Sequence, residues 1–334
     1  MPNDVLTQKQ TRSRRFAPLG VVFGLVGVLL FAYFVSKAGV GEIAARIQRL
    51  GAGFVLILAV SSLRYIVRAV AWMLCVEPPF RLRFRDAFAG RLMGDALGNI
   101  VPFLSVAVAE PSKAVFVKDR VPLMVGFSAL AIENIFYALS VALFIFAGTA
   151  TLLLTFPLPK PLRYASIAAL IVTLLILPLI YLIVRRQTRF LSRVAGYFGF
   201  TKKLKSRALA LEDRIYGFYA NTQRSFILIF ALEMCFHLAG VLEIFVTLSF
   251  ISPMAPTLTQ AFILESVNRI INLTFKFIPL RAGVDEGGTG SVSKVLGIGR
   301  DIGVTLAIVR KGRDIFWSAI GVLLIWGRGH RLSG

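Results

Sequence analysis

Long apolar blocks follow one another along this chain, with shorter polar segments between them. The blocks are mostly free of charge, and their apolar residues are continuous instead of alternating with a period of two. About 20 apolar residues suffice to cross a bilayer as a helix, and in lipid only helices and closed barrels satisfy the backbone. The continuous pattern therefore predicts spanning helices and not barrel strands. The blocks cover residues 18–36, 52–76, 121–156, 164–184, 225–251 and 315–326.

The polar segments between the blocks differ in charge. Basic residues gather in the tail before the first block, at 81–85, in the connector 185–224 and at 328–331, whereas 148–163 and 251–260 are poor in charge and rich in proline. Cytoplasmic loops of membrane proteins carry an excess of Lys and Arg. We therefore expect a chain of the inner membrane with both termini, residues 77–86 and residues 185–224 in the cytoplasm.

The N-terminal basic residues and the apolar run after them resemble a signal peptide. The run is longer than a secretory core of about 7–15 residues, so we interpret 18–36 as a retained first helix. The expected organisation is a basic cytoplasmic tail at 1–17, a transmembrane domain at 18–327 and a cytoplasmic tail at 328–334.

Two further segments, 86–120 and 258–300, remain between the six expected crossings. If the basic loops are to stay on one side, each of these segments must return to the side from which it enters. We expect both to be re-entrant, the first from the cytoplasm and the second from outside. The fold class is therefore an all-α polytopic membrane protein with about six transmembrane helices plus two re-entrant, proline-broken segments.

The two leftover segments share a pattern. Each has an arginine ten or eleven positions before a proline, an asparagine between the two, and a glutamate seven or eight positions after the proline. Broken helices in corresponding places of two halves indicate a transporter's central site, and three crossings between them predict an inverted repeat. The alternative is a coincidence between two short loops that contain Pro and Gly. The matching residues are Arg91, Asn99, Pro102 and Glu110, and Arg269, Asn272, Pro279 and Glu286.

At these residues the chain resembles a known family. The pattern is Gly94-Asp95-Ala-Leu-Gly98-Asn99-Ile-Val-Pro102, then Glu110-Pro-Ser-Lys113, and later Pro279-x-x-x-Gly283-x-x-Glu286. It is similar to the lysylphosphatidylglycerol synthase transmembrane, or flippase-like, family over about residues 15–327.

This resemblance implies a domain that moves lipid across the membrane. In the family's aminoacyl-lipid synthases, a separate cytoplasmic domain carries out aminoacyl transfer, and the 334 residues contain no such domain. After Pro102 the chain reads Phe103-Leu-Ser-Val-Ala-Val-Ala, where the family's glycine-rich form is expected, so the resemblance does not identify the lipid. Phosphate-bearing and hopanoid-type lipids both remain open.

Ionisable residues inside the apolar blocks are the candidate site. Each costs about 2.5–3.5 kcal/mol to insert, and such residues usually mark transport paths or ion pairs. Arginine binds phosphate bidentately, and a helix N-terminus adds a favourable dipole. The residues expected to bind lipid are Arg91, Asn99, Glu110, Lys113, Glu133, Arg269, Asn272, Glu286, Arg310, Arg313 and Asp314.

Glu133 and Arg310 lie equally far from the two prolines. Each is 31 positions after its own proline, so opposite charges occupy equivalent places in the two halves. We expect them to line one polar cavity, together with Arg313 and Asp314.

Several of these residues have simpler interpretations. Glu265, Arg269, Asn272 and Lys276 share a helical face by their spacing, and Glu265–Arg269 is equally consistent with a structural ion pair. Arg64 and Arg68 are spaced to snorkel to an interface. Three glutamates also have a second interpretation: Glu110 and Glu286 as helix caps or proton carriers, and Glu243 as a structural residue near the outer surface.

The connector 185–224 alternates basic residues with Phe190, Val194, Tyr197 and Phe198. This pattern favours a helix lying on anionic lipid; the alternative is a solvated linker. The chain's net charge of +21 follows from the positive-inside bias. No nucleic-acid partner is expected, because no finger, helix-turn-helix or stacking sheet is visible.

Motifs of catalysis are missing from the sequence. It contains no HExxH, GxSxG, P-loop or Cys/His cluster, and its two histidines and two cysteines have no metal-site spacing. We expect no enzyme activity, no cofactor and no metal, with membrane lipids and lipid-biosynthesis enzymes as partners. The alternatives to a lipid transporter are an accessory or scaffold protein of lipid biosynthesis and an intramembrane transferase using only Glu and Arg.

Overall fold

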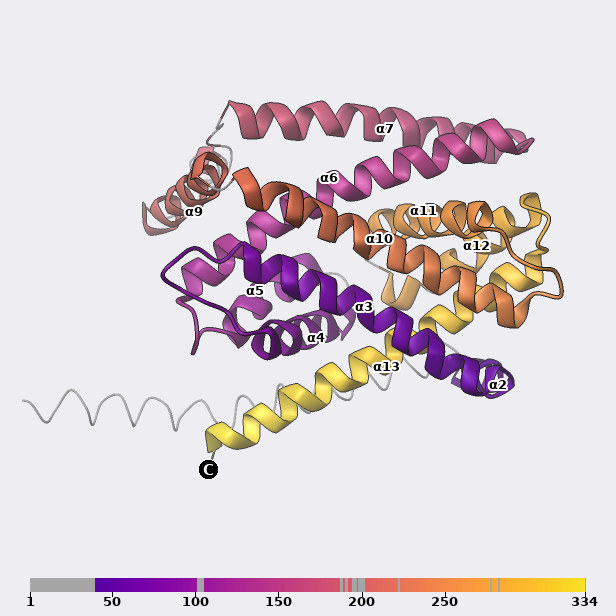
Figure 1. Ribbon diagram of the computed structural model, residues 1–334, viewed down its shortest axis with the longest axis horizontal. Helices are drawn as coiled ribbons and strands as arrows, with labels where there is room; N and C mark the ends of the chain where they lie inside the picture. The colour runs from indigo at the N-terminus through magenta and orange to yellow at the C-terminus, as the bar shows by residue number, and fades with distance from the viewer. Residues whose placement is uncertain are drawn as a thin grey trace, which may run out of the picture.

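The computed structural model describes residues 40–100, 105–186, 189, 192–193, 197, 202–221, 223–276, 278–281 and 283–333. The expected tail 1–17 and first span 18–36 lie outside these residues. Within the described part the regular structure is entirely helical, so the chain is an all-α polytopic membrane protein (Figure 1). The helices are α2 (Val40–Leu50), α3 (Ala52–Leu74), α4 (Phe84–Ile100), α5 (Ser105–Phe116), α6 (Leu123–Thr155), α7 (Lys160–Arg185), α9 (Lys202–Asn221), α10 (Gln223–Ile251), α11 (Leu258–Thr274), the 3-10 turn η2 (Pro279–Arg281), α12 (Val284–Val295) and α13 (Arg300–Ser333).

Four of the described helices are long and apolar enough to cross a membrane. They are Ala52–Leu74, Leu123–Thr155, Lys160–Leu179 and Ser225–Ile251, and they confirm the four apolar blocks expected there. The last expected block, 315–326, is the second half of α13. With 34 residues this helix is about 51 Å long at 1.5 Å per residue, and four charged residues interrupt its middle at 310–314.

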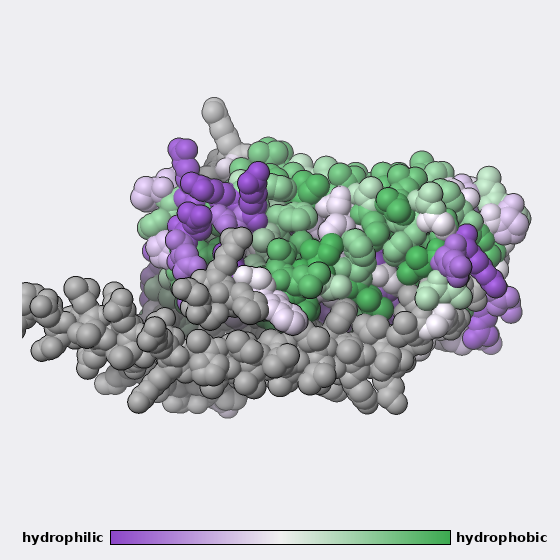
Figure 2. All heavy atoms as spheres, turned by 90° about the horizontal axis from the view of Figure 1, so that it is seen from below, coloured by the Kyte–Doolittle hydropathy of each residue, from purple (hydrophilic) through white to green (hydrophobic). Residues whose placement is uncertain are grey.

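Apolar side chains cover the middle of the molecular surface. Figure 2 shows one face on which hydrophobic residues form a broad central area, with hydrophilic residues gathered toward the two ends. Helix α7, at the top of Figure 1 and so on the opposite side, is apolar and exposed as well, because Ile171, Leu174 and Leu175 are each more than half exposed. A central apolar belt between polar ends is the pattern expected of a protein surrounded by lipid.

The same order of elements occurs twice along the chain. A long helix, a 17-residue helix, a break, a 12-residue helix and a very long helix make up the series α3–α6 and again the series α10–α13. The closing helices have 33 and 34 residues. Pro102 lies between α4 and α5 but outside the described residues, and Pro279 begins η2, five residues after α11 ends at Thr274.

Helices of one series pack against helices of the other. Helix α3 lies against α10, α4 of the first series packs on α13 of the second, and α11 packs on α6. Glycines allow both exchanged contacts, since a Cβ at Gly321 would overlap the Leu92 carbonyl oxygen of α4, and a Cβ at Gly148 would overlap Ser266 of α11. Small residues let membrane helices approach closely in this way.

The two broken segments lie at opposite ends of the long axis. In Figure 1, α4 and α5 lie toward the end that also holds α9, the basic loop after α3 and the C-terminal part of α13. Helices α11 and α12 lie toward the other end, together with α2 and the short connections after α6 and α10. The basic segments thus share one end of the molecule, and the connectors poor in charge share the other.

Two apolar cores leave a polar zone between them. Along α10, Ile229 belongs to the first core and Val241 to the second, and Glu233 and His237 lie between these positions. Along α6, the first core ends at Phe136 and the second begins at Phe144. The ionisable side chains of the spanning helices are concentrated in this zone.

The described part of the basic connector folds back onto the protein. Ile215 and Phe218 of α9 are buried in the first core, and Arg214 pairs with Glu77 at 3.2 Å. Of the four apolar residues that suggested a lipid-facing helix, Phe190, Val194 and Phe198 lie outside the described residues, and Tyr197 is 89% exposed.

Candidate functional site

Arg64 and Arg68 lie one turn apart on α3 and turn inward. Arg68 donates to Glu133 Oε1 from Nε at 2.8 Å, and Arg64 Nη1 donates to Glu243 Oε2 at 3.3 Å. Their side chains are only 14% and 12% exposed. The snorkelling alternative is therefore wrong for both, because their partners are buried carboxylates from α6 and α10.

Glu133 is the centre of the first polar cluster. Its side chain is fully buried, and its Oε1 lies 2.7 Å from Arg68 Nη2 and 2.6 Å from Arg91 Nη2. Arg91 of α4 is itself 1% exposed, and its guanidinium lies 5.7 Å from the centre of the Trp72 ring. Helices α3, α4 and α6 thus bring two cations onto one carboxylate.

Glu110 and Lys113 extend this cluster along α5. Lys113 Nζ lies 2.8 Å from Glu110 Oε1 and 2.8 Å from Asp95 Oδ1, and Asn134 donates to Glu110 Oε2 at 3.0 Å. The expectation that Glu110 caps a helix is wrong. Helix α5 already begins at Ser105, with Pro111 inside it, so the Glu110 side chain is free to bind Lys113 and Asn134 instead of a helix end.

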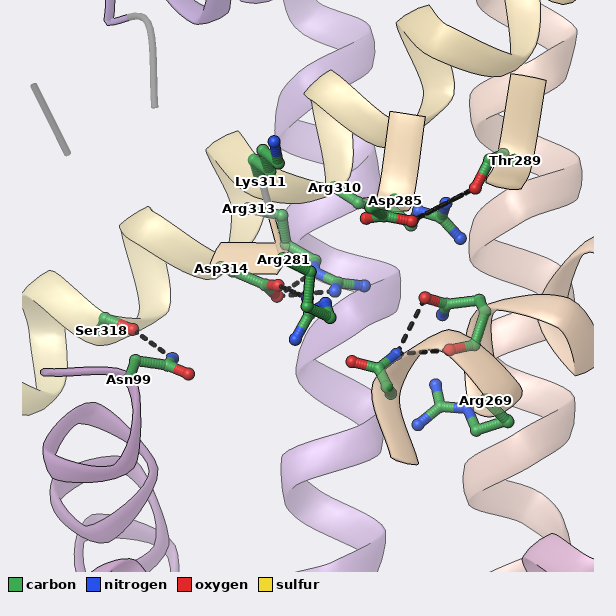
Figure 3. A network of polar contacts seen from close by, with 12 residues as sticks. Asn99, Arg269, Arg281, Asp285, Thr289, Arg310, Lys311, Arg313, Asp314 and Ser318 are labelled. Carbon is green, nitrogen blue, oxygen red and sulfur yellow. Dashed lines mark hydrogen bonds and ion pairs between the residues drawn. The ribbon is translucent and has the colours of Figure 1, made fainter. Parts of the chain in front are cut away.

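Arg310 is the centre of the second polar cluster. Its Nη2 lies 2.8 Å from Asp285 Oδ1 and 2.6 Å from the Thr289 hydroxyl (Figure 3). Arg310 is 3% exposed and Asp285 is fully buried. Beside them Lys311 binds Glu286, whose other oxygen accepts a hydrogen bond from the Gly283 backbone N–H at 2.8 Å. The capping interpretation of Glu286 is therefore confirmed, with an ion pair added to the cap.

Arg313 and Asp314 connect α13 to its neighbours. Arg313 binds Glu243 of α10, and it also donates to Asp314 Oδ1 from Nη2 at 2.6 Å. Asp314 Oδ2 accepts from Arg281 at 2.8 Å, so the turn η2 is tied to α13 (Figure 3). Glu243, expected near the outer surface, is buried between Arg64 and Arg313.

The polar face expected on α11 is present except at its end. Arg269 binds Glu265 one turn earlier, and Asn272 donates to Asn268 Oδ1 at 2.8 Å. Lys276 does not belong to this face, because α11 ends at Thr274 and Lys276 is exposed in the turn that follows.

A phenylalanine lies among three of the arginines. The Phe236 ring of α10 is 4.6 Å from the Arg64 guanidinium, 5.5 Å from that of Arg68 and 5.0 Å from that of Arg269. Cations over an aromatic face in a desolvated site are attracted by about 2 kcal/mol. Arg68 of the first polar cluster therefore meets Arg64 and Arg269, which bind Glu243 and Glu265, around one ring.

Glu133 and Arg310 have parallel surroundings. In each case the next residue on the helix binds the glutamate of its own broken segment, Asn134 to Glu110 and Lys311 to Glu286. Among the described residues Glu133 binds Arg68 and Arg91, whereas Arg310 binds Asp285 and Thr289, so the two have no partner in common. Their equivalent placement stands, while a common cavity stays a prediction.

Two of the buried arginines keep donors without a partner. Arg91 Nε and Nη1 and Arg310 Nε and Nη1 make no hydrogen bond within the described part of the chain. A buried, unbonded N–H of a charged group is costly. Arg91 in the first series and Arg310 in the second are thus each held by a carboxylate and still have two or more donors for an anion, whereas Arg64 and Arg281 each leave only Nε without a partner among the described residues.

A comparison with known protein families shows which family the chain is related to. The family described as Lysylphosphatidylglycerol synthase TM region matches residues 19–321. The chain belongs to this family. Comparison with curated proteins and with solved structures finds no match.

In this member of the lysylphosphatidylglycerol synthase TM family, the motif residues lie where the two series meet. Asn99 of α4 donates to Ser318 of α13 at 2.8 Å, which links the first broken segment to the closing helix of the second series (Figure 3). Trp317 donates to Ser61 of α3 at 2.8 Å beside it.

His237 is a packed helix residue, as expected. It is fully buried, stacked 4.7 Å from the Phe144 ring centre, with Nε2 3.2 Å from the Ser140 hydroxyl. Within the described ranges, no group of three or more His, Cys, Asp or Glu side chains is placed to hold a metal.

Sequence reasoning missed several partners that complete the site in this family member. Asp285 and Lys311 each lie next to a predicted site residue, and Arg281 lies two positions after the Pro279 that marked the break. A rule that charged neighbours of a broken segment are paired would have found them. The partners outside the expected site residues are Arg64 and Arg68, which the sequence had suggested as snorkelling residues, together with Asp95, Glu233, Arg281, Asp285 and Lys311.

Proposed function

We propose that this chain moves a phosphate-bearing amphipathic lipid, chemically unchanged, between the two leaflets of its membrane. One observation carries the proposal: Arg91 and Arg310, one in each series, are buried arginines with donors left over. A phosphate diester can accept two parallel N–H bonds from such a guanidinium. A neutral hopanoid-type headgroup has no use for these cations, so the phosphate-bearing class is favoured.

We interpret the two series as an inverted repeat with oppositely inserted broken segments. Matching helix lengths and the placement of the broken segments at opposite ends support this interpretation. In transporters built from inverted repeats, the substrate site lies between the repeats near the bilayer midplane. The polar zone around Phe236 has that position between the two apolar cores.

The proposed orientation places the end that holds α9 in the cytoplasm, in an inner membrane. The concentration of basic segments at this end supports it. The test uses a chain with Cys75 and Cys235 replaced by serine, with Asp213→Cys on α9 or Met254→Cys at the other end, since both positions are exposed. In intact cells a membrane-impermeant thiol reagent should label Met254→Cys only; labelling of Asp213→Cys alone would reverse the orientation.

Lipid movement is tested with purified protein in vesicles that contain a tail-labelled fluorescent phosphatidylglycerol. An impermeant quencher reports the labelled lipid in the outer leaflet over time. Wild-type protein should make nearly all labelled lipid accessible, and Arg310→Gln should slow this by about 10- to 100-fold, because a hydrogen bond to a charged group contributes about 1.5–3 kcal/mol.

The matched control is Arg120→Gln, which removes an arginine that is 51% exposed and paired with Asp86 at 3.5 Å. It should scramble at the wild-type rate. Wild-type vesicles in which only the outer half of the label is ever quenched would reject transport. Such protein, if it still co-purified with lipid-modifying enzymes, would instead act as an accessory to them.

A further inference from the structure

Two buried carboxyl groups lie against one guanidinium in the first polar cluster. Glu133 of α6 and Glu233 of α10 are both fully buried, and Arg68 Nε is 2.8 Å from Glu133 Oε1 and 3.8 Å from Glu233 Oε2. Neither oxygen of Glu233 accepts a hydrogen bond from a donor group of the described residues. Its nearest cation is Arg68, whose Nε lies 3.8 Å away. Two carboxyl groups can share a hydrogen bond only when one of them carries a proton.

Only some of the charged side chains near Glu233 are available to it, because others are bound to different partners. Helix α11 directs Arg269 to Phe236, and α13 directs Arg313 to Glu243, so neither cation is bound to Glu233. On α10 itself the nearest titratable neighbour along the helix is His237, which is bound to Ser140. The charged side chains around Glu233 are Arg68 on α3, which lies near both carboxyl groups, Glu133 on α6 and, bound to Glu133, Arg91 on α4.

Charge balance connects this carboxyl pair to the arginines. With both glutamates ionised, Arg68 and Arg91 are neutralised. One proton on the pair leaves one unit of positive charge, which is the charge that a single phosphate diester would neutralise. Lys113 binds two carboxylates, Glu110 and Asp95, so these three side chains together carry one further negative charge beside the pair, and Asp95 is 41% exposed. In a low-dielectric interior an uncompensated charge is expensive, so anion and proton stabilise each other's binding.

We propose that Glu133 and Glu233 share one proton, taken from water, and that the protein carries this proton together with an anionic lipid headgroup bound at Arg91. The inference rests on the proposed lipid transport and adds its coupling ion. The proton adds to one oxygen of the pair when the phosphate enters, and it returns to water when the phosphate leaves. One anionic headgroup and one proton move together with no net charge, so the movement depends on the pH difference and not on the membrane potential.

The experiment measures how labelled phosphatidylglycerol distributes between leaflets at steady state, in wild-type vesicles with a pH difference of one unit. One proton per lipid predicts a distribution shifted about tenfold toward the alkaline side. A distribution that stays even, while scrambling proceeds at the normal rate, overturns the proton coupling and leaves the proposed transport intact. Absence of scrambling at every pH overturns both.

Variants assign the response to the carboxyl pair. Glu233→Gln should lose the shift, and Glu233→Asp should restore part of it, while Glu77→Gln, at a glutamate outside the spans paired with Arg214, should keep the full shift. A full shift in Glu233→Gln overturns the assignment.

A spectroscopic readout covers the case in which Glu233→Gln is inactive. The infrared difference spectrum of wild-type protein between acid and alkaline pH should show the carbonyl stretch of a protonated carboxylic acid, absent from Glu233→Gln. An identical band in both proteins overturns the proposal.

Discussion

The two series of helices place opposite charges at equivalent positions. In the first, the closing helix α6 supplies the buried anion Glu133, and the arginines come from α3 and α4. In the second, the closing helix α13 supplies the buried cation Arg310, and the anion comes from α12. The difference shows that two series of helices with the same arrangement can take the buried anion from different helices, provided that each buried charge keeps a counter-ion.

Replacing the buried carboxylate of either cluster should lower the stability of the protein more than any other substitution. Glu133→Gln leaves Arg68 and Arg91 without their shared carboxylate, and breaking a buried pair costs about 3–5 kcal/mol. Asp285→Asn should cost less, because Thr289 still accepts from Arg310 at 2.6 Å. Thermal unfolding of the detergent-solubilised protein, followed by tryptophan fluorescence, measures both. Glu133 binds two arginines and Asp285 binds one. Equal losses of unfolding free energy in the two variants would contradict the larger contribution expected of Glu133.

Glycine substitutions at the exchanged contacts should have the next largest effect. Gly321→Ala places a methyl group on the Leu92 backbone oxygen, which cannot rotate away, and overpacking of this kind costs about 1–3 kcal/mol. Gly148→Ala should cost about as much, because the new methyl group meets the Ser266 hydroxyl and also its Cβ at 2.4 Å, which no change of rotamer moves. The same unfolding assay compares them.

The control for these substitutions is Gly217→Ala on α9, where a new Cβ meets nothing within 4 Å. It should be neutral or stabilising by about 0.5–1 kcal/mol, as expected for alanine in a helix interior. If Gly321→Ala were as well tolerated as Gly217→Ala, the close approach of α4 and α13 would be wrong.

The spanning helices could be predicted from the sequence because their signal is local. The block at 52–76 corresponds to Ala52–Leu74, and the four-residue spacing of Glu265 and Arg269 indicated the ion pair as one of two interpretations. Both depend only on residues within one helix. Pro279 likewise lies in the interruption between α11 and α12.

Ion pairs between residues far apart in the chain could not be predicted from the sequence. Arg64 binds Glu243 across 179 positions, and nothing local indicates that α3 packs along α10. Glu110 was misassigned as a cap because Glu-Pro is typical of a helix start, while tertiary packing kept Pro111 inside α5. Lys276 matched the polar face of α11 by spacing, but the helix ends two residues before it.

The central claim is that both series contribute to one lipid path. Its most direct test compares lipid scrambling by Arg91→Gln, Arg310→Gln and Arg120→Gln proteins in the same vesicles. If a headgroup must pass both arginines in turn, each of the first two variants should scramble at no more than about a tenth of the wild-type rate, and Arg120→Gln should match wild type. Arg91→Gln and Arg310→Gln proteins that each keep about half of the rate, with losses that add, would show two independent paths and contradict the account.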